Sequence, residues 1–243
     1  GLSRWFFRIR LTFLTLLSDD ELMVDRQAVL RLTAAMCGVF IVLFGITLFN
    51  THVLASLSLP LRMITMIVSQ WLLFLVPGLM MKRSRISMFD IGFDKSHVAR
   101  QVLLGILAAC IMSALLTVVP ILFGFRDAVG STQYSEAWQF AYEFVYTIFG
   151  VALAEELIFR GYLFHELLAI RPSRWFAMVC SSLLFGLFHI FSGNILQIVI
   201  TAFIGFAYCL MCEKIKNFTL LSLILAHGIY DALITVWVAF LLR

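Results

Sequence analysis

Residues 195–212 decide the fold class: they read ILQIVITAFIGFAYCLMC and contain no charged residue. A helix rises about 1.5 Å per residue, so roughly 20 apolar residues cross the ~30 Å hydrocarbon core of a bilayer. Similar stretches recur along the chain, which predicts an all-α fold, a polytopic transmembrane helix bundle. The seven candidate helices lie at about 32–49, 63–81, 102–123, 137–158, 175–190, 195–212 and 218–242. Residues 161–170 are interpreted as a separate, short interfacial helix.

The composition supports the same fold class. Of the 243 residues 62% are hydrophobic and 13% charged, and the mean hydropathy is +1.01. A soluble domain has roughly 45–50% apolar and about 25% charged residues. These values exclude a soluble enzyme, a disordered chain and a disulfide-stapled secreted domain. The length predicts a single membrane domain, residues 1–243, with about seven spans and eight as the alternative.

The first residues differ from the rest in pattern. Arg4, Arg8 and Arg10 alternate with aromatic and apolar residues, and the apolar run that follows is too short to span a bilayer. A cleavable signal peptide is the alternative, but no small-x-small cleavage site follows the run. We expect residues 1–27 to form an interfacial amphipathic helix on the inner leaflet.

The basic residues predict the orientation. They concentrate in alternate loops: Lys82, Arg83, Arg85, Lys95, Arg100; Arg171, Arg174; Lys214, Lys216. Basic loops stay in the cytoplasm, so we expect a cytoplasmic N-terminus and, with seven spans, an external C-terminus. The net charge of +4 has no nucleic-acid motif beside it, so membrane lipids are expected partners and nucleic acid is not. A bacterial inner membrane is favoured, with the eukaryotic endoplasmic reticulum as the alternative.

Charged residues inside the predicted spans fall in residues 137–242, which we expect to be the catalytic helices. Each costs about 2.5–3.5 kcal/mol to insert, so each is a functional candidate. Glu156 and Arg160 are four residues apart on one helix face and can pair, which leaves Glu155 the less compensated carboxylate. Such a carboxylate suits a general base. The alternative is a purely structural ion pair at a helix end.

Two further helices carry polar side chains. One contains Phe185 and His189, and the last contains His227 and Asp231 on one face. A lone intramembrane histidine is more often an interhelical hydrogen-bonding residue than a catalyst. Two histidines on separate helices from the glutamates instead predict one shared polar site. Asn194 either orients this site or caps the next helix.

The sequence offers little for a metal or for redox chemistry. His165 and Glu166 resemble the start of a zinc-binding H-E-x-x-H helix, but Ala169 stands where the second histidine belongs. Cys209 and Cys212 form a C-x-x-C in an apolar helix and are interpreted as small hydrophobes. No cofactor is expected; zinc held by carboxylates and histidines is the alternative.

The three motifs, in this order and at this spacing, resemble the CPBP family (CAAX protease and bacteriocin-processing, also called Abi) of intramembrane glutamate-type endopeptidases. They are Glu155, Glu156 with Arg160; Phe185 with His189; and His227 with Asp231. The resemblance implies that Glu155 or Glu156 is the base for water and that His189 positions this water or the acyl intermediate. It also implies that His227 and residue 231 face the developing oxyanion, with Phe185 as an accessory residue and Arg160 pairing charge.

Residue 231 raises a chemical question. The family pattern admits Asn or Asp there, and only Asn donates a hydrogen bond to an oxyanion. Asp231 must therefore be protonated, orient His227 or bind something else.

The resemblance implies an endopeptidase that cuts a small peptide or a protein tail, in bacteriocin or microcin maturation, self-immunity or peptide signalling. The alternative is a non-proteolytic immunity or assembly protein that binds a peptide in the same cavity. A proton-coupled transporter is a third reading, without an inverted repeat to support it. The substrate and the oligomeric state are left open by the sequence.

One geometric difficulty follows from the predicted spans. If the fourth helix ends near Arg160, Glu155 lies close to one membrane surface while His189 lies toward the other. Tilt resolves this, as does a fourth helix that continues to Arg171 and places Glu155 deeper.

Overall fold

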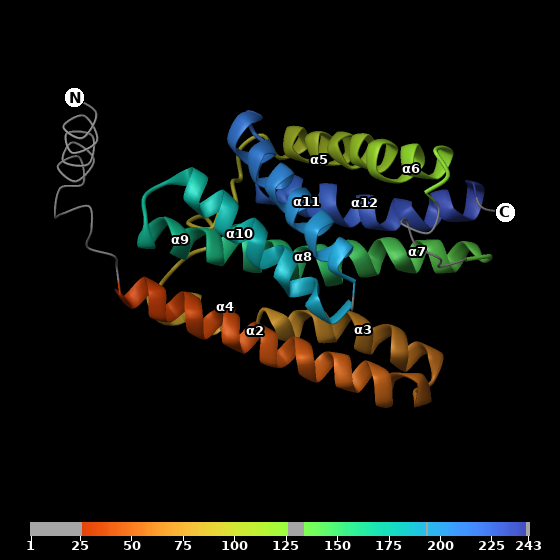
Figure 1. Ribbon diagram of the computed structural model, residues 1–243, viewed down its shortest axis with the longest axis horizontal. Helices are drawn as coiled ribbons and strands as arrows, with labels where there is room; N and C mark the ends of the chain where they lie inside the picture. The colour runs from red at the N-terminus through yellow and green to blue at the C-terminus, as the bar shows by residue number, and fades with distance from the viewer. Residues whose placement is uncertain (1–25, 126–133, 193, 242–243) are drawn as a thin grey trace, which may run out of the picture.

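The computed structural model describes residues 26–125, 134–192 and 194–241, and within these ranges every regular element is a helix (Figure 1). The all-α prediction is therefore confirmed for the described residues. The interfacial helix predicted at residues 1–27 lies almost wholly outside them.

The first helices are α2 (Arg26–His52), α3 (Leu59–Leu73), α4 (Leu75–Ser84), α5 (Val98–Ser113) and α6 (Val119–Leu122). The later ones are α7 (Ala137–Val145), α8 (Leu153–Glu156), α9 (Phe164–Ile170), α10 (Arg174–Phe188), α11 (Ile195–Lys214) and α12 (Leu220–Leu241).

Five of the described helices are long and apolar enough to cross a bilayer: Arg26–His52, Val98–Leu122, Arg174–Phe191, Ile195–Lys214 and Leu220–Leu241. A sixth is obtained if α3 and α4, bent by 40° at Phe74, form one broken span. The protein is thus an integral membrane protein with several spans. The prediction of about seven spans, or eight, is not confirmed by this count.

Residues 137–170 are helical throughout but not as one regular α-helix. Two π-helical segments, Tyr146–Ala152 and Leu157–Leu163, separate α7, α8 and α9. The predicted fourth helix at 137–158 and the separate short helix at 161–170 are therefore one continuous helical segment. The helix does not break at Arg160. Gly161 and its neighbours are buried, and Gly161 packs against Ile91 in the loop after α4, as expected for a helix inside the protein core.

This continuity resolves the difference in depth. Glu155 lies fifteen residues before the end of α9 at Ile170, and His189 lies fifteen residues after the start of α10 at Arg174. The connection between the two helices is a short turn, so they run back along each other (Figure 1). At about 1.5 Å per residue, both side chains lie roughly 22 Å from that turn.

The helices pack through small residues that allow their backbones to approach closely. A Cβ at Gly228 of α12 would lie 2.6 Å from the Cα of Ile148, and one at Gly105 of α5 would lie 2.6 Å from the carbonyl oxygen of Ser222. Glycines at such contacts are typical of membrane helix packing. These two glycine contacts allow α12, which carries His227, to pack between α5 and the π-helical segment Tyr146–Ala152.

The loops rich in basic residues meet at one end of the bundle. The amide of Leu220 donates to the carbonyl of Gly92, which joins the loop after α4 to the start of α12. Arg174 at the start of α10 pairs with Glu213 near the end of α11. One shared end for these loops is what the predicted orientation requires, although the cytoplasmic side of that end stays a prediction.

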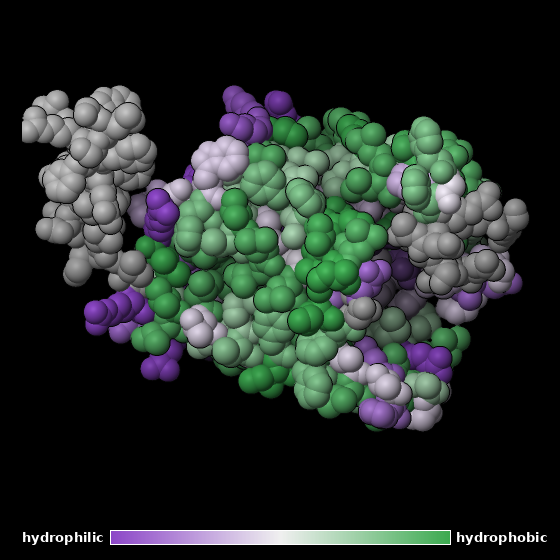
Figure 2. All heavy atoms as spheres, viewed as in Figure 1, coloured by the Kyte–Doolittle hydropathy of each residue, from purple (hydrophilic) through white to green (hydrophobic). Residues whose placement is uncertain are grey.

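The surface is that of a membrane protein. Large apolar side chains point outward on several helices, including Ile41 on α2, Leu103 on α5 and Phe203 on α11. Figure 2 shows hydrophobic residues covering the middle of one face, with hydrophilic residues gathered toward its ends. This distribution fits a bundle whose sides contact lipid tails and whose ends contact water.

Candidate functional site

His227 of α12 is the centre of the polar cluster inside the bundle. Its Nδ1 lies 2.7 Å from Oε1 of Glu156, and its Nε2 lies 3.3 Å from Oδ2 of Asp231 and 3.9 Å from Oε2 of Glu155. The residue is 6% exposed. Three carboxylates from two helices therefore surround one imidazole in a water-poor environment.

Both glutamates reach this histidine because of the local helix geometry. Glu155 and Glu156 are the last two residues of α8, a helix of four residues with π-helical turns on either side. π-helical turns change the phase of a helix and occur frequently at functional sites. The two neighbouring carboxylates diverge by about 100°, and Glu156 lies at Nδ1 of His227 while Glu155 lies on the side of Nε2.

Arg160 compensates one of the two glutamates. Its Nη1 donates to Oε1 of Glu156 at 3.0 Å, and its guanidinium lies 4.0 Å above the Phe185 ring. The predicted Glu156–Arg160 pair is present. Oε2 of Glu155 is buried and has no hydrogen-bond partner among the described residues. Glu155 is therefore the less compensated carboxylate.

Phe185 and His189 join the cluster from α10. The ring centroids of Phe185 and His189 lie 5.1 Å apart, and those of Phe185 and His227 lie 6.0 Å apart, both edge to face. Nδ1 of His189 lies 3.0 Å from the carbonyl oxygen of Phe185. If Nδ1 carries the proton and donates to this carbonyl, Nε2 keeps the lone pair. The side chains of all three motifs thus gather around Phe185.

Asn194 is not brought into the cluster. It is exposed and precedes α11, where its Oδ1 accepts a hydrogen bond from the amide of Leu196 at 2.9 Å. This is the geometry of a helix N-cap, the second of the two roles considered for it.

Within residues 26–125, 134–192 and 194–241, no three His, Cys, Asp or Glu side chains are arranged to hold a metal ion. Both ring nitrogens of His227 already face carboxylates. Glu166, the second residue of the incomplete zinc motif, instead binds Arg31 of α2, with Nε 3.0 Å from each carboxylate oxygen. This pair joins α2 to α9.

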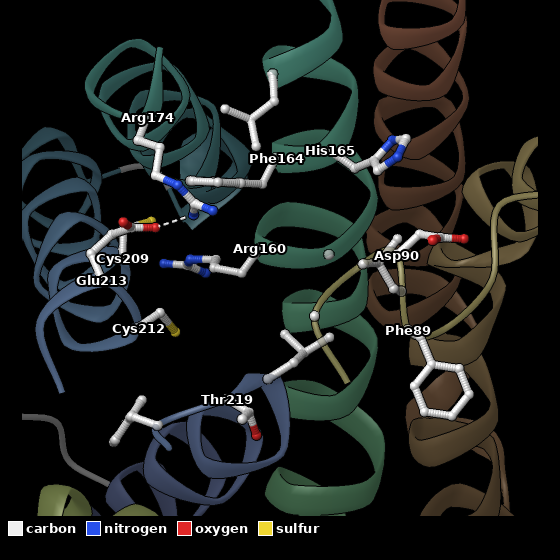
Figure 3. Close-up of a pocket in the computed structure, with 16 residues that line it drawn as sticks. Phe89, Asp90, Arg160, Phe164, His165, Arg174, Cys209, Cys212, Glu213 and Thr219 are labelled. Carbon is white, nitrogen blue, oxygen red and sulfur yellow. Dashed lines mark hydrogen bonds and ion pairs between the residues drawn. The ribbon is translucent and has the colours of Figure 1, made fainter. Parts of the chain in front are cut away.

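A cavity of about 310 Å³ approaches the cluster from the end that holds the basic loops (Figure 3). Arg160 projects into it, Cys209 and Cys212 line one wall, and the Arg174–Glu213 pair lies at its edge. Asp90 lies on the opposite side, where hydrogen bonds from the Ser87 hydroxyl and amide lower the pKa of its carboxyl. The cavity therefore connects an edge with charged residues to the buried guanidinium.

Sequence analysis missed two residues of this site. Tyr208 of α11 is fully buried, with its ring centroid 5.6 Å from that of His227. Gly205, one turn earlier, leaves room for Arg160: a Cβ there would lie 2.7 Å from Nη2. Both stand in the apolar stretch 195–212, where a tyrosine and a glycine resemble ordinary packing residues, so nothing in the sequence distinguishes them.

Comparison with known proteins agrees with the motifs. Residues 137–233 match the family model described as type II CAAX prenyl endopeptidase Rce1-like. The matched segment contains all three motifs, which confirms the resemblance to the CAAX-protease family for this part of the chain. No match was found among curated proteins or among solved structures.

Proposed function

We propose that this chain, whose residues 137–233 match the Rce1-like family of CAAX-type proteases, is an intramembrane endopeptidase that activates water with Glu155. Its substrate is a small peptide or the tail of a protein. The proposal extends to a bacterial inner membrane, with a role in bacteriocin maturation, self-immunity or peptide signalling.

The observation that supports it most is the arrangement of His227 among Glu155, Glu156 and Asp231. A buried carboxylate without a hydrogen-bond partner is unfavourable, and such groups persist where chemistry uses them. Glu156 is engaged by Arg160 and His227. Glu155 is the carboxylate that remains free to accept a proton.

The chemistry can be written with these groups. Glu155 accepts a proton from water, and the hydroxide oxygen attacks the scissile carbonyl carbon, so that a tetrahedral intermediate with a negative oxygen forms. The carbon–nitrogen bond then breaks, and the proton held by Glu155 passes to the leaving amine. His189 positions the water, and the His227 ring, held by Glu156 and Asp231, lies beside the developing charge.

A cavity and a groove are the candidate binding sites for the substrate. The cavity at the basic end leads toward Arg160, and its volume of about 310 Å³ is at the lower end of the range of small-ligand sites. An apolar groove of about 640 Å³ lies between α10 and α11 and includes Leu183, Leu187 and Phe203. A groove of this kind suits a lipid-modified tail, in keeping with the prenyl endopeptidase family that residues 137–233 match.

The test uses purified full-length protein in liposomes. A farnesylated peptide with a CAAX-type C-terminus and the same peptide without the farnesyl group are offered, and products are identified by mass spectrometry. We expect cleavage by the wild type, loss of cleavage in His227→Ala, and normal cleavage in His52→Ala, because His52 is exposed at the end of α2. Equal cleavage by the His227→Ala variant would contradict the proposal.

The second candidate is a non-proteolytic immunity or assembly protein that binds a peptide in the same cavity. The burial of the two glutamates favours this second candidate: Glu155 is 5% exposed and Glu156 is fully buried. In that case the liposomes retain the peptide uncut in a binding assay, and His227→Ala weakens the retention.

A further inference from the structure

A buried tyrosine beside the cluster has a hydroxyl with no partner. Among the described residues the Tyr208 hydroxyl is buried and makes no hydrogen bond. The other unpartnered atoms of the cluster are carboxylate oxygens of Glu155 and Glu156 and two nitrogens of Arg160. Tyr208 thus supplies the one neutral hydroxyl donor among them. Buried polar groups in native proteins are nearly always satisfied, so this exception calls for an explanation.

The helix register places Tyr208 level with the catalytic histidine. It lies six residues before the end of α11 at Lys214, and His227 lies seven residues after the start of α12 at Leu220. Its ring packs 5.6 Å from the His227 ring and 5.5 Å from Cζ of Arg160. The residue interacts electrostatically with Asp231 and Glu156, the two carboxylates closest to His227.

Both ring nitrogens of His227 face carboxylates, so the proposed reaction needs a hydrogen-bond donor for the oxyanion from another side chain. A tetrahedral intermediate needs donors aimed at its negative oxygen. Asp231 lies 3.3 Å from Nε2 of His227, where an ionised carboxylate accepts a hydrogen bond and orients the ring. An accepting carboxylate repels an oxyanion. Asp231 therefore accounts for the position of His227 and does not supply the donor.

We propose that the Tyr208 hydroxyl donates a hydrogen bond to the oxyanion of the tetrahedral intermediate, the task that Asp231 cannot perform. The inference rests on the proposed endopeptidase function. In the resting protein the hydroxyl has no partner among the described residues, and it gains one only when the intermediate forms. An interaction made only in the transition state and the intermediate raises kcat and leaves KM nearly unchanged.

The first test is Tyr208→Phe in the liposome cleavage assay. Loss of one oxyanion donor typically lowers kcat about 10²–10³-fold, so we expect a fall of this size with KM within about twofold. The removed hydroxyl has no partner in the described part of the chain, so the unfolding midpoint in detergent should stay the same or rise. Tyr162→Phe is the matched control, since Tyr162 is also fully buried but its hydroxyl lies 3.5 Å from Sδ of Met80. This control should keep wild-type kcat.

The second test is a rescue. The Asp231→Asn substitution introduces an amide that can donate a hydrogen bond to an oxyanion. The double variant Tyr208→Phe/Asp231→Asn should therefore have a kcat about tenfold or more above that of Tyr208→Phe alone. Unchanged kcat in Tyr208→Phe, or a fall in kcat accompanied by a lower unfolding midpoint and no rescue, overturns the inference. If the wild type cleaves and Glu155→Gln does not, while Tyr208→Phe is fully active, only this inference fails. If the wild type cleaves neither peptide, the proposed function fails and this inference falls with it.

Discussion

Replacement of Arg160 by Ala tests whether the buried charges are balanced as the geometry indicates. Arg160 is 7% exposed, and its one hydrogen bond to a carboxylate goes to Glu156 at 3.0 Å. Removal of one partner of a buried ion pair destabilises a protein by about 3–5 kcal/mol, because a charge is left uncompensated. Glu156 keeps its contact with His227 at 2.7 Å, so we expect the lower end of this range, about 3 kcal/mol.

The double variant Arg160→Ala/Glu156→Gln separates charge from packing. If the uncompensated carboxylate causes most of the loss, its neutralisation should restore about half of the lost free energy of unfolding, roughly 1.5 kcal/mol. The lost contact with the Phe185 ring is not restored. The matched control is Arg160→Ala/Glu143→Gln, because Glu143 is hydrogen-bonded by Tyr134 and is not one of the described carboxylates that face His227. It should recover nothing.

The assay is unfolding by denaturant in detergent micelles, followed by tryptophan fluorescence and repeated at two protein concentrations. Wild-type stability in Arg160→Ala would refute the reasoning, since it would mean that the guanidinium is solvated. Equal recovery by the Glu156→Gln and Glu143→Gln double variants would also refute it, because the rescue would then not depend on the ion pair.

Three further outcomes are expected. Cysteines introduced at Ser84 and Ser96, both exposed near the basic end, should resist a membrane-impermeant maleimide added from outside intact cells; efficient labelling would reverse the orientation. Gly228→Ala should lower the unfolding midpoint strongly, because its Cβ would meet the backbone of Ile148 at 2.6 Å, whereas Gly45→Ala has open space and should be tolerated; equal midpoints would argue against close packing of α12. A chelator such as 1,10-phenanthroline should leave peptide cleavage unchanged, and a loss restored by added zinc would establish a metalloprotease.

The parts of the fold that depend on local sequence could be predicted. Long apolar stretches indicate membrane helices whatever their neighbours, and the pair Glu156–Arg160 follows from the periodicity of one helix. The same holds for His227 and Asp231, also four residues apart. These contacts need no knowledge of the tertiary structure.

The remaining features depend on contacts distant in sequence or on subtle helix geometry. From the sequence, residues 161–170 are interpreted as a separate interfacial helix, yet Glu166 is fully buried and pairs with Arg31, 135 residues away. The π-helical turns on either side of the two glutamates have no recognised sequence signature. Tyr208 is equally hidden, since its role depends on which helix lies beside α11.

The central claim is that Glu155 is the base, and the most direct measurement is kcat for Glu155→Gln in the liposome assay. The substitution keeps the shape of the side chain and removes its basicity. We expect cleavage to fall about 10²–10⁴-fold, with the unfolding midpoint close to that of the wild type and with Glu143→Gln fully active as the matched control. His189→Ala combined with Glu155→Gln should be no worse than Glu155→Gln alone, because the groups act together. Wild-type cleavage by a correctly folded Glu155→Gln variant would contradict the account.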